Sequence, residues 1–113
     1  MEIITQAITL PRLREMAESK FGDMVKAVVD VEKGIMAVDG ELHADEEAQL
    51  MMHGSKQASL WGITVYPDAG IGDWIEFDSM NNLRPSQGNR TRGVENPQVR
   101  QRILEIVSQL VTR

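Results

Sequence analysis

The chain of 113 residues contains no cysteine, and this absence excludes several kinds of chemistry at once. Disulfide bonds, thiolate nucleophiles, iron–sulfur clusters and cysteine-ligated zinc sites all need a residue that the chain does not have. A protein without cysteines also suits a reducing compartment. We therefore expect a fold that depends on neither disulfides nor cysteine-bound metals.

Aromatic residues and long apolar runs are scarce as well. Five aromatic residues are too few for the row of exposed rings on which single-stranded nucleic acids stack. No apolar run approaches the roughly 18 residues that a membrane span needs, and the N-terminal residues lack the pattern of a secretory signal. The sequence predicts one compact, soluble, cytoplasmic domain over residues 1–113.

Charge is present but unevenly distributed. The formal net charge is −5, yet residues 1–82 carry a net −9 and residues 83–113 a net +4. All six basic residues of the second part are arginines: Arg84, Arg90, Arg92, Arg100, Arg102 and Arg113. A guanidinium pairs with a carboxylate or phosphate at two points, so we expect a specific negative counterpart. That counterpart can belong to the same chain, to a second copy in a homo-oligomer, or to another molecule.

Capping residues and helical spacing predict three helices. Thr9 and Pro11 begin the first, which Gly22 ends, and a second covers residues 42–53. Asn96 and Pro97 begin the third, which has the strongest amphipathic pattern in the chain.

Apolar, β-branched runs predict strands near the N-terminus and over residues 24–31, 35–38, 60–66 and 73–80. The order β-α-β-β-α-β-β-α predicts an α+β fold, with an antiparallel or mixed sheet of four or five strands and three helices. We expect the helices to pack over one face of the sheet. The hairpin over residues 24–38 is apolar enough to be buried on both faces.

Residues 81–95 are predicted to form a long loop that is rich in hydrogen-bond donors. Such long connections are often functional. Arginine, amide and hydroxyl groups together suit an anionic ligand, and the candidate anion-binding residues are Arg84, Ser86, Gln87, Asn89, Arg90 and Arg92. In the structural alternative, the arginines clamp the loop to Glu76, Asp78 or another acidic side chain.

Glu76 and Asp78 are the candidate catalytic residues. Two positions apart on a strand, they present carboxylates on one face, about 7 Å apart at Cα. The alternation places Trp74 on that same face, either at a ligand surface or under a helix, and Ile75 and Phe77 on the other. An acid–base role requires Asp78 to line one pocket with Arg84 and Arg90.

The sequence contains no pattern typical of a metal site or a nucleotide-binding site. His43 and His53 lie too far apart along one helix to share an ion, and first-turn acids such as Asp45 are more often partners of the helix dipole than metal ligands. Gly70 and Gly72 lack the third glycine of a dinucleotide fingerprint, and no Walker loop is present. We predict neither a metal nor a cofactor.

Three stretches carry a resemblance to a known family: IEFDSMNNLRPSQGNRTRGVENPQVRQRI, VKAVVDVEKGIMAVDGELHAD and GSKQASLWGITVYP. On these residues the chain resembles a small prokaryotic family catalogued as a domain of unknown function. The resemblance implies a stand-alone compact domain and carries no activity, ligand or catalytic residue with it.

Three functions therefore remain open. The first is a non-enzymatic binding protein whose arginine loop contacts an anionic small molecule or protein partner. The second is a small hydrolase or transferase with Glu76 or Asp78 as acid or base and loop arginines as electrostatic stabilisers. The third is a nucleic-acid-binding accessory protein, which the acidic residues 1–82 disfavour. No membrane partner is expected.

Overall fold

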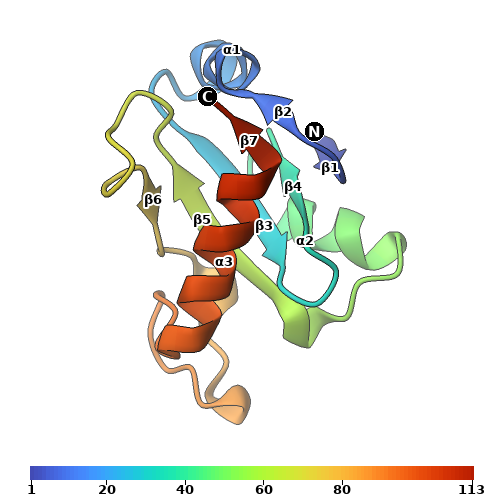
Figure 1. Cartoon of the computed structure of the whole chain (residues 1–113). Coiled ribbons are helices and arrows are strands. Elements are labelled where there is room, and N and C mark those ends of the chain that lie inside the picture. The colour runs from blue at the N-terminus through green and yellow to red at the C-terminus, as the bar shows by residue number, and fades with distance from the viewer.

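A computed structural model describes all 113 residues and confirms the α+β class (Figure 1). The three helices are α1 (Leu10–Lys20), α2 (His43–Met52) and α3 (Pro97–Leu110). The seven strands are β1 (Glu2–Ile4), β2 (Ile8–Thr9), β3 (Val25–Asp30), β4 (Ile35–Val38), β5 (Leu60–Val65), β6 (Ile75–Glu76) and β7 (Val111–Thr112). Three single-turn 3-10 helices lie at Gln57–Ser59, Met80–Asn82 and Pro85–Gln87. None of the helices combines the length and apolar character that a membrane crossing requires.

The main sheet has the strand order β1-β4-β3-β5-β6, and each neighbouring pair is antiparallel. The β3–β4 hairpin forms its centre together with β5, as its apolar sequence predicts. Strands β2 and β7 form a separate parallel pair that joins the two ends of the chain. Each of these strands has two residues, too few for an alternation that sequence reasoning could detect.

Helices cover both faces of the main sheet, so the prediction of one covered face is wrong. Helices α1 and α3 pack on one face with side chains such as Val29 and Ile63, while α2 packs on the other, where Leu50 meets Val28 and Leu60. Figure 1 shows α3 across the front of the sheet and α2 behind it. Because β3 is apolar on both sides, each side needs its own cover to exclude water.

Strand β6 is shorter than predicted, and Trp74 lies just before it. Only Ile75 and Glu76 pair with β5, where the expected strand covered residues 73–80. Trp74 is 3% exposed and belongs to the core, with the Arg113 guanidinium 4.3 Å from its ring. Of the two placements left open for Trp74, the buried one is therefore confirmed.

Helix α2 buries an unusual residue, Glu46. Its side chain has no exposed surface, Oε2 accepts the N–H of Gly40 at 3.0 Å, and Oε1 has no hydrogen-bond partner. Burial raises the pKa of the Glu46 carboxyl to about 9, because a low-dielectric environment disfavours the charged form. Glycine is required at position 40, since a Cβ there would lie 2.6 Å from Glu46 Cγ.

Candidate functional site

Asn82, in the predicted loop, completes the edge of strand β5. The Gly62 N–H donates to Asn82 Oδ1 at 2.8 Å, and Asn82 Nδ2 donates back to the Gly62 carbonyl at 2.9 Å. Beyond the two-residue strand β6, this side-chain amide therefore replaces the backbone of a neighbouring strand. Gly62 itself leaves room for the approach, because a Cβ there would lie 2.6 Å from Ser79.

Arg84 binds the same edge of β5 two residues before Gly62, at Leu60. Its guanidinium donates to the carbonyl oxygens of Leu60, Gln57 and Asn81, and it lies 4.8 Å from the Trp61 ring. It also pairs with Glu47 of α2 at 3.3 Å, and its side chain is 10% exposed. Burial lowers the pKa of Arg84 and the Glu47 carboxylate opposes that change. The structure therefore uses Arg84 as a clamp.

Asn89 has a similar structural role. Its Nδ2 donates to the carbonyls of Asn82, Thr91 and Gly93, its Oδ1 accepts the Glu95 N–H, and the residue is 3% exposed. These bonds fold residues 82–95 into a compact loop. An isolated antiparallel β-bridge between Arg84 and Asn89 closes the same loop.

Ser86, Gln87 and Arg90, three of the four remaining predicted loop residues, lie at the surface. Gln87 donates to the Ala58 carbonyl at 3.2 Å, and Ser86 is exposed. The Arg90 side chain is exposed and forms no ion pair, although its backbone N–H donates to Glu95. Arg90 lines none of the concavities of the molecule.

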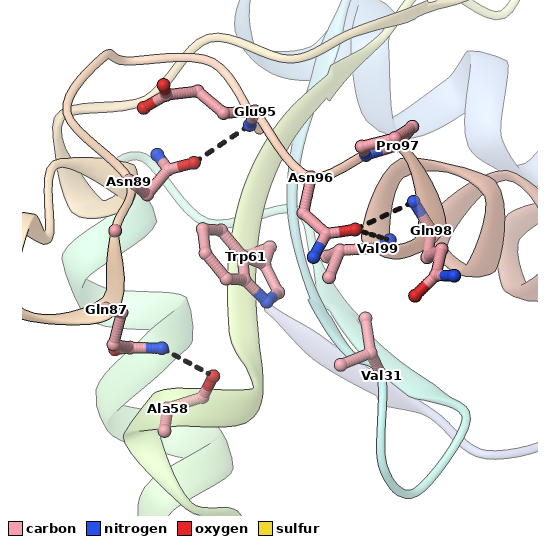
Figure 2. A pocket seen from close by; sticks show the side chains of 11 residues that line it. Val31, Ala58, Trp61, Gln87, Asn89, Glu95, Asn96, Pro97, Gln98 and Val99 are labelled. Carbon is pink, nitrogen blue, oxygen red and sulfur yellow. Dashed lines mark hydrogen bonds between the residues drawn. The ribbon is translucent and has the colours of Figure 1, made fainter.

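The largest concavity, about 700 Å³, lies between this segment and the start of α3 (Figure 2). Figure 2 shows Gln87 and Asn89 on one side of Trp61, and Asn96 and Gln98 on the other. Its lining residues include one titratable side chain, Glu95, and no lysine, arginine or histidine. It therefore offers hydrogen-bonding amides and one carboxylate, and no positively charged group.

A second concavity, of about 350 Å³, is smaller and chemically richer. We call it the Arg92 cleft. It lies beside α2, β5 and β6, and its lining residues are Met24, Lys26, Leu42, His43, Ala44, Thr64, Glu76, Asp78, Ser79, Met80, Asn81 and Arg92. Five of these can carry charge. The cleft thus unites Arg92 with both predicted carboxylates, while Arg84 and Arg90 lie outside it.

The Asp78 carboxylate binds Arg92 through a single nitrogen of the guanidinium, Nε. Asp78 Oδ1 accepts the Arg92 Nε–H at 2.6 Å, and neither terminal nitrogen of the guanidinium has a hydrogen-bond partner in the protein. The Arg92 side chain is 54% exposed. Four N–H donors therefore remain for a ligand. Glu76 accepts the Tyr66 hydroxyl at 3.3 Å on the same strand.

A hydrogen bond to the backbone determines which ring nitrogen of His43 carries the proton. Its Nε2 lies 2.7 Å from the Ile63 carbonyl, which can only accept, so Nε2 carries the proton and Nδ1 keeps its lone pair. Burial lowers the pKa of His43, the bond to Ile63 opposes this, and nearby Lys26 lowers it further. A neutral imidazole with an available Nδ1 can accept a proton at neutral pH.

Lys26 and His43 were not predicted as site residues. Lys26 Nζ donates to the Glu41 carbonyl at 3.1 Å and lies 5.0 Å from the Phe21 ring. The alternation of β3 does point to Lys26, because it is the one charged residue that interrupts a buried strand before Asp30. His43 carries no comparable signal in the sequence.

Acidic residues gather nowhere in a pattern suited to a metal. No three histidine, aspartate or glutamate side chains come together around a common point. Asp45 lies in the first turn of α2, where a negative charge favours the positive end of the helix dipole.

The chain forms a small α+β domain whose Arg92 cleft is lined by side chains of both charge signs. The chain belongs to a family described as a protein of unknown function (DUF5674), whose model matches residues 2–110. That match bears out the expectation of a domain-of-unknown-function family. No curated protein and no solved structure matches the chain.

Proposed function

We propose that the Arg92 cleft binds a small polar molecule that carries an oxyanion together with hydroxyl or ammonium groups. The observation that carries this proposal is the orientation of Arg92. Because Asp78 binds only Nε, both terminal nitrogens remain free for the two-point pairing that phosphates and carboxylates favour. Lys26 adds a second positive charge to the same concavity.

The rest of the ligand follows from the other groups of the cleft. Two carboxylates balance the charges of Lys26 and Arg92, so a bare anion meets repulsion as well as attraction. Glu76, Asp78 and the Thr64 hydroxyl can accept hydrogen bonds from ligand hydroxyl or ammonium groups. A molecule with an oxyanion can pair with Arg92 and Lys26, while its hydroxyl or ammonium groups donate to Glu76 and Asp78.

The proposal keeps one residue of the predicted anion-binding set at its centre. Arg84 and Asn89 already donate to backbone carbonyls, so their donors are not available without loosening the segment. Ser86, Gln87 and Arg90 lie outside the cleft. Nothing in the arrangement favours nucleic acid.

We expect O-phosphoserine, which carries phosphate, carboxylate and ammonium groups, to bind the native chain and to shift the NMR signals of Arg92 and His43. Arg92→Ala removes the guanidinium and should weaken binding by at least about tenfold, the effect of losing one charge-assisted pair. Arg90→Ala is the matched control, because it removes a loop arginine outside the cleft. Equal loss of binding in both variants, or shifts confined to Arg90, would contradict the proposal.

We propose general base catalysis in the same cleft as a second candidate function, because His43 lines it and Nδ1 of the neutral ring makes no hydrogen bond in the protein. Nδ1 would take a proton from a water molecule that attacks an ester carbonyl, and the alcohol would leave as that proton is returned. This differs from the predicted use of Glu76 or Asp78, since Asp78 is already paired with Arg92.

We expect nitrogen-correlated NMR to show the Nε2–H tautomer of His43 and a pKa below the ordinary 6.5. With p-nitrophenyl acetate as the probe, the native chain should hydrolyse the ester above the free-imidazole rate, and His43→Gln should lower that rate about 100-fold. Glutamine can still donate to the Ile63 carbonyl, so the fold contact is kept. The Nδ1–H tautomer, or turnover that survives the substitution, would exclude this role.

A further inference from the structure

Exposed apolar side chains concentrate around helix α2. Of the eight large hydrophobic residues that are exposed, three lie in or next to this helix: Leu42, Met51 and Met52. Met52 is 80% exposed, the highest value in the set. Three others border concavities that α2 also lines: Met1, Met80 and Leu83. Scattered single hydrophobic residues are ordinary on a protein surface, but a gathered set marks an interaction surface.

The outer face of α2 is a continuous apolar stripe. Ala44, Ala48 and Met52 follow one another at four-residue spacing and are all exposed, whereas Glu46 and Leu50 face the sheet. The two alanines of the stripe, Ala44 and Ala48, have small side chains, which lets another helix approach closely. We call this surface the α2 face.

The two ends of α2 carry opposite charge. Glu41 and Asp45 lie at its N-terminal end. At its C-terminal end are Lys56, which pairs with Glu32 at 3.6 Å, and Lys33, whose Nζ lies 3.1 Å from the position of a Cβ on Gly54. Two copies of α2 packed antiparallel would therefore place each acidic end beside the partner's basic end. The helix dipoles favour the same orientation, because each positive end then meets a negative one.

We propose that the α2 face binds a second copy of this chain, with the two α2 helices antiparallel about a twofold axis. The same patch then serves both copies, and the assembly closes as a dimer. A parallel arrangement would set the acidic ends against each other. Ala44 belongs both to this face and to the lining of the Arg92 cleft, so the second copy would border the cleft. The dimer does not depend on a ligand in that cleft.

The test is sedimentation equilibrium of the full chain over about 5 to 500 μM, a range chosen for a weak homodimer. We expect the apparent mass to rise to that of a dimer. Ala48→Glu places a charge at the middle of the stripe and should leave a monomer, whereas Ser108→Glu, at an exposed position of α3, should not. Circular dichroism of the monomeric variant checks that the helix remains.

Charge reversal tests the antiparallel orientation. Asp45→Lys and Lys56→Glu should each weaken the dimer about tenfold or more, and the chain that carries both changes should recover it, because opposite charges face each other again. A native chain that is monomeric throughout overturns the proposal and leaves another protein as the occupant of the α2 face. A dimer that persists in Ala48→Glu, or no recovery in the doubly reversed chain, overturns it as well.

Discussion

Glu46→Gln should stabilise the protein at neutral pH, although it replaces an ionisable residue of the core. The Glu46 carboxyl has no exposed surface and its pKa is raised to about 9. Glutamine has the same shape as the protonated carboxyl, and its side-chain oxygen can still accept the Gly40 N–H. The substitution therefore keeps the neutral state of this residue at every pH.

The sign of the pH dependence follows from the direction of the pKa change. The folded state holds the proton up to about pH 9, while the unfolded chain releases it near pH 4.5. The stabilisation from the bound proton is complete below pH 4.5 and is lost as pH rises to about 9, at about 1.4 kcal/mol per pH unit. At pH 7 the loss amounts to about 3 kcal/mol.

Urea unfolding of the native chain and of Glu46→Gln at several pH values between 5 and 9 measures this effect. The difference in unfolding free energy should be about 1 kcal/mol or less at pH 5 and grow with pH to about 3 kcal/mol at pH 7. Taking the difference removes the contributions of all other titrating groups. Glu18→Gln, at an exposed position of α1 with no ion pair, should show no such growth. A constant difference across the range would contradict the raised pKa.

Asn82→Ala should destabilise the fold by about 3 to 5 kcal/mol, because three backbone groups lose their partner at once. These are the Gly62 N–H and carbonyl and the Arg92 carbonyl. Asn82 has no exposed surface, so water cannot replace the amide without opening the segment. The unfolding temperature should fall by about 10 to 20 °C for a chain of this length.

Thermal unfolding measures the loss of stability, and hydrogen exchange measures the loss of the Gly62 hydrogen bond. The Gly62 amide should exchange faster in Asn82→Ala, since its hydrogen bond is gone. Asn81→Ala is the matched control: its side chain makes one hydrogen bond, to Glu47 at 3.2 Å, and it should cost less than about 1 kcal/mol. Equal stability of the two variants would mean that the β5 edge does not depend on the Asn82 amide.

Much of the fold could be predicted from local patterns. Thr9 and Asn96 cap their helices as expected, because a cap depends on residues two or three positions away. The β3–β4 hairpin was predictable for the same reason, since its strands are joined by a short turn. The cover on both faces of the sheet could have been inferred from the two-sided burial of that hairpin.

The role of residues 81–95 could not be predicted in the same way. Their donors were visible in the sequence, and both an anionic ligand and an internal partner remained open. Arg84 and Asn82 bind carbonyl and amide groups of residues 57–62, which lie 20 to 27 positions earlier. Nothing in the loop sequence indicates that β6 ends after two residues and leaves part of the β5 edge to be paired.

Short-range chemistry determined the helices, the hairpin, the class of fold and the presence of a donor-rich segment, because turns, caps and apolar periodicity act between neighbours in the chain. The packing of distant elements decided which donors remain for a ligand. A guanidinium or an amide has a fixed number of N–H groups, and the carbonyls that occupy them come from strands elsewhere in the sequence. Arg84 lies against such carbonyls, while Arg92 is held by one nitrogen in a cleft beside His43 and Lys26.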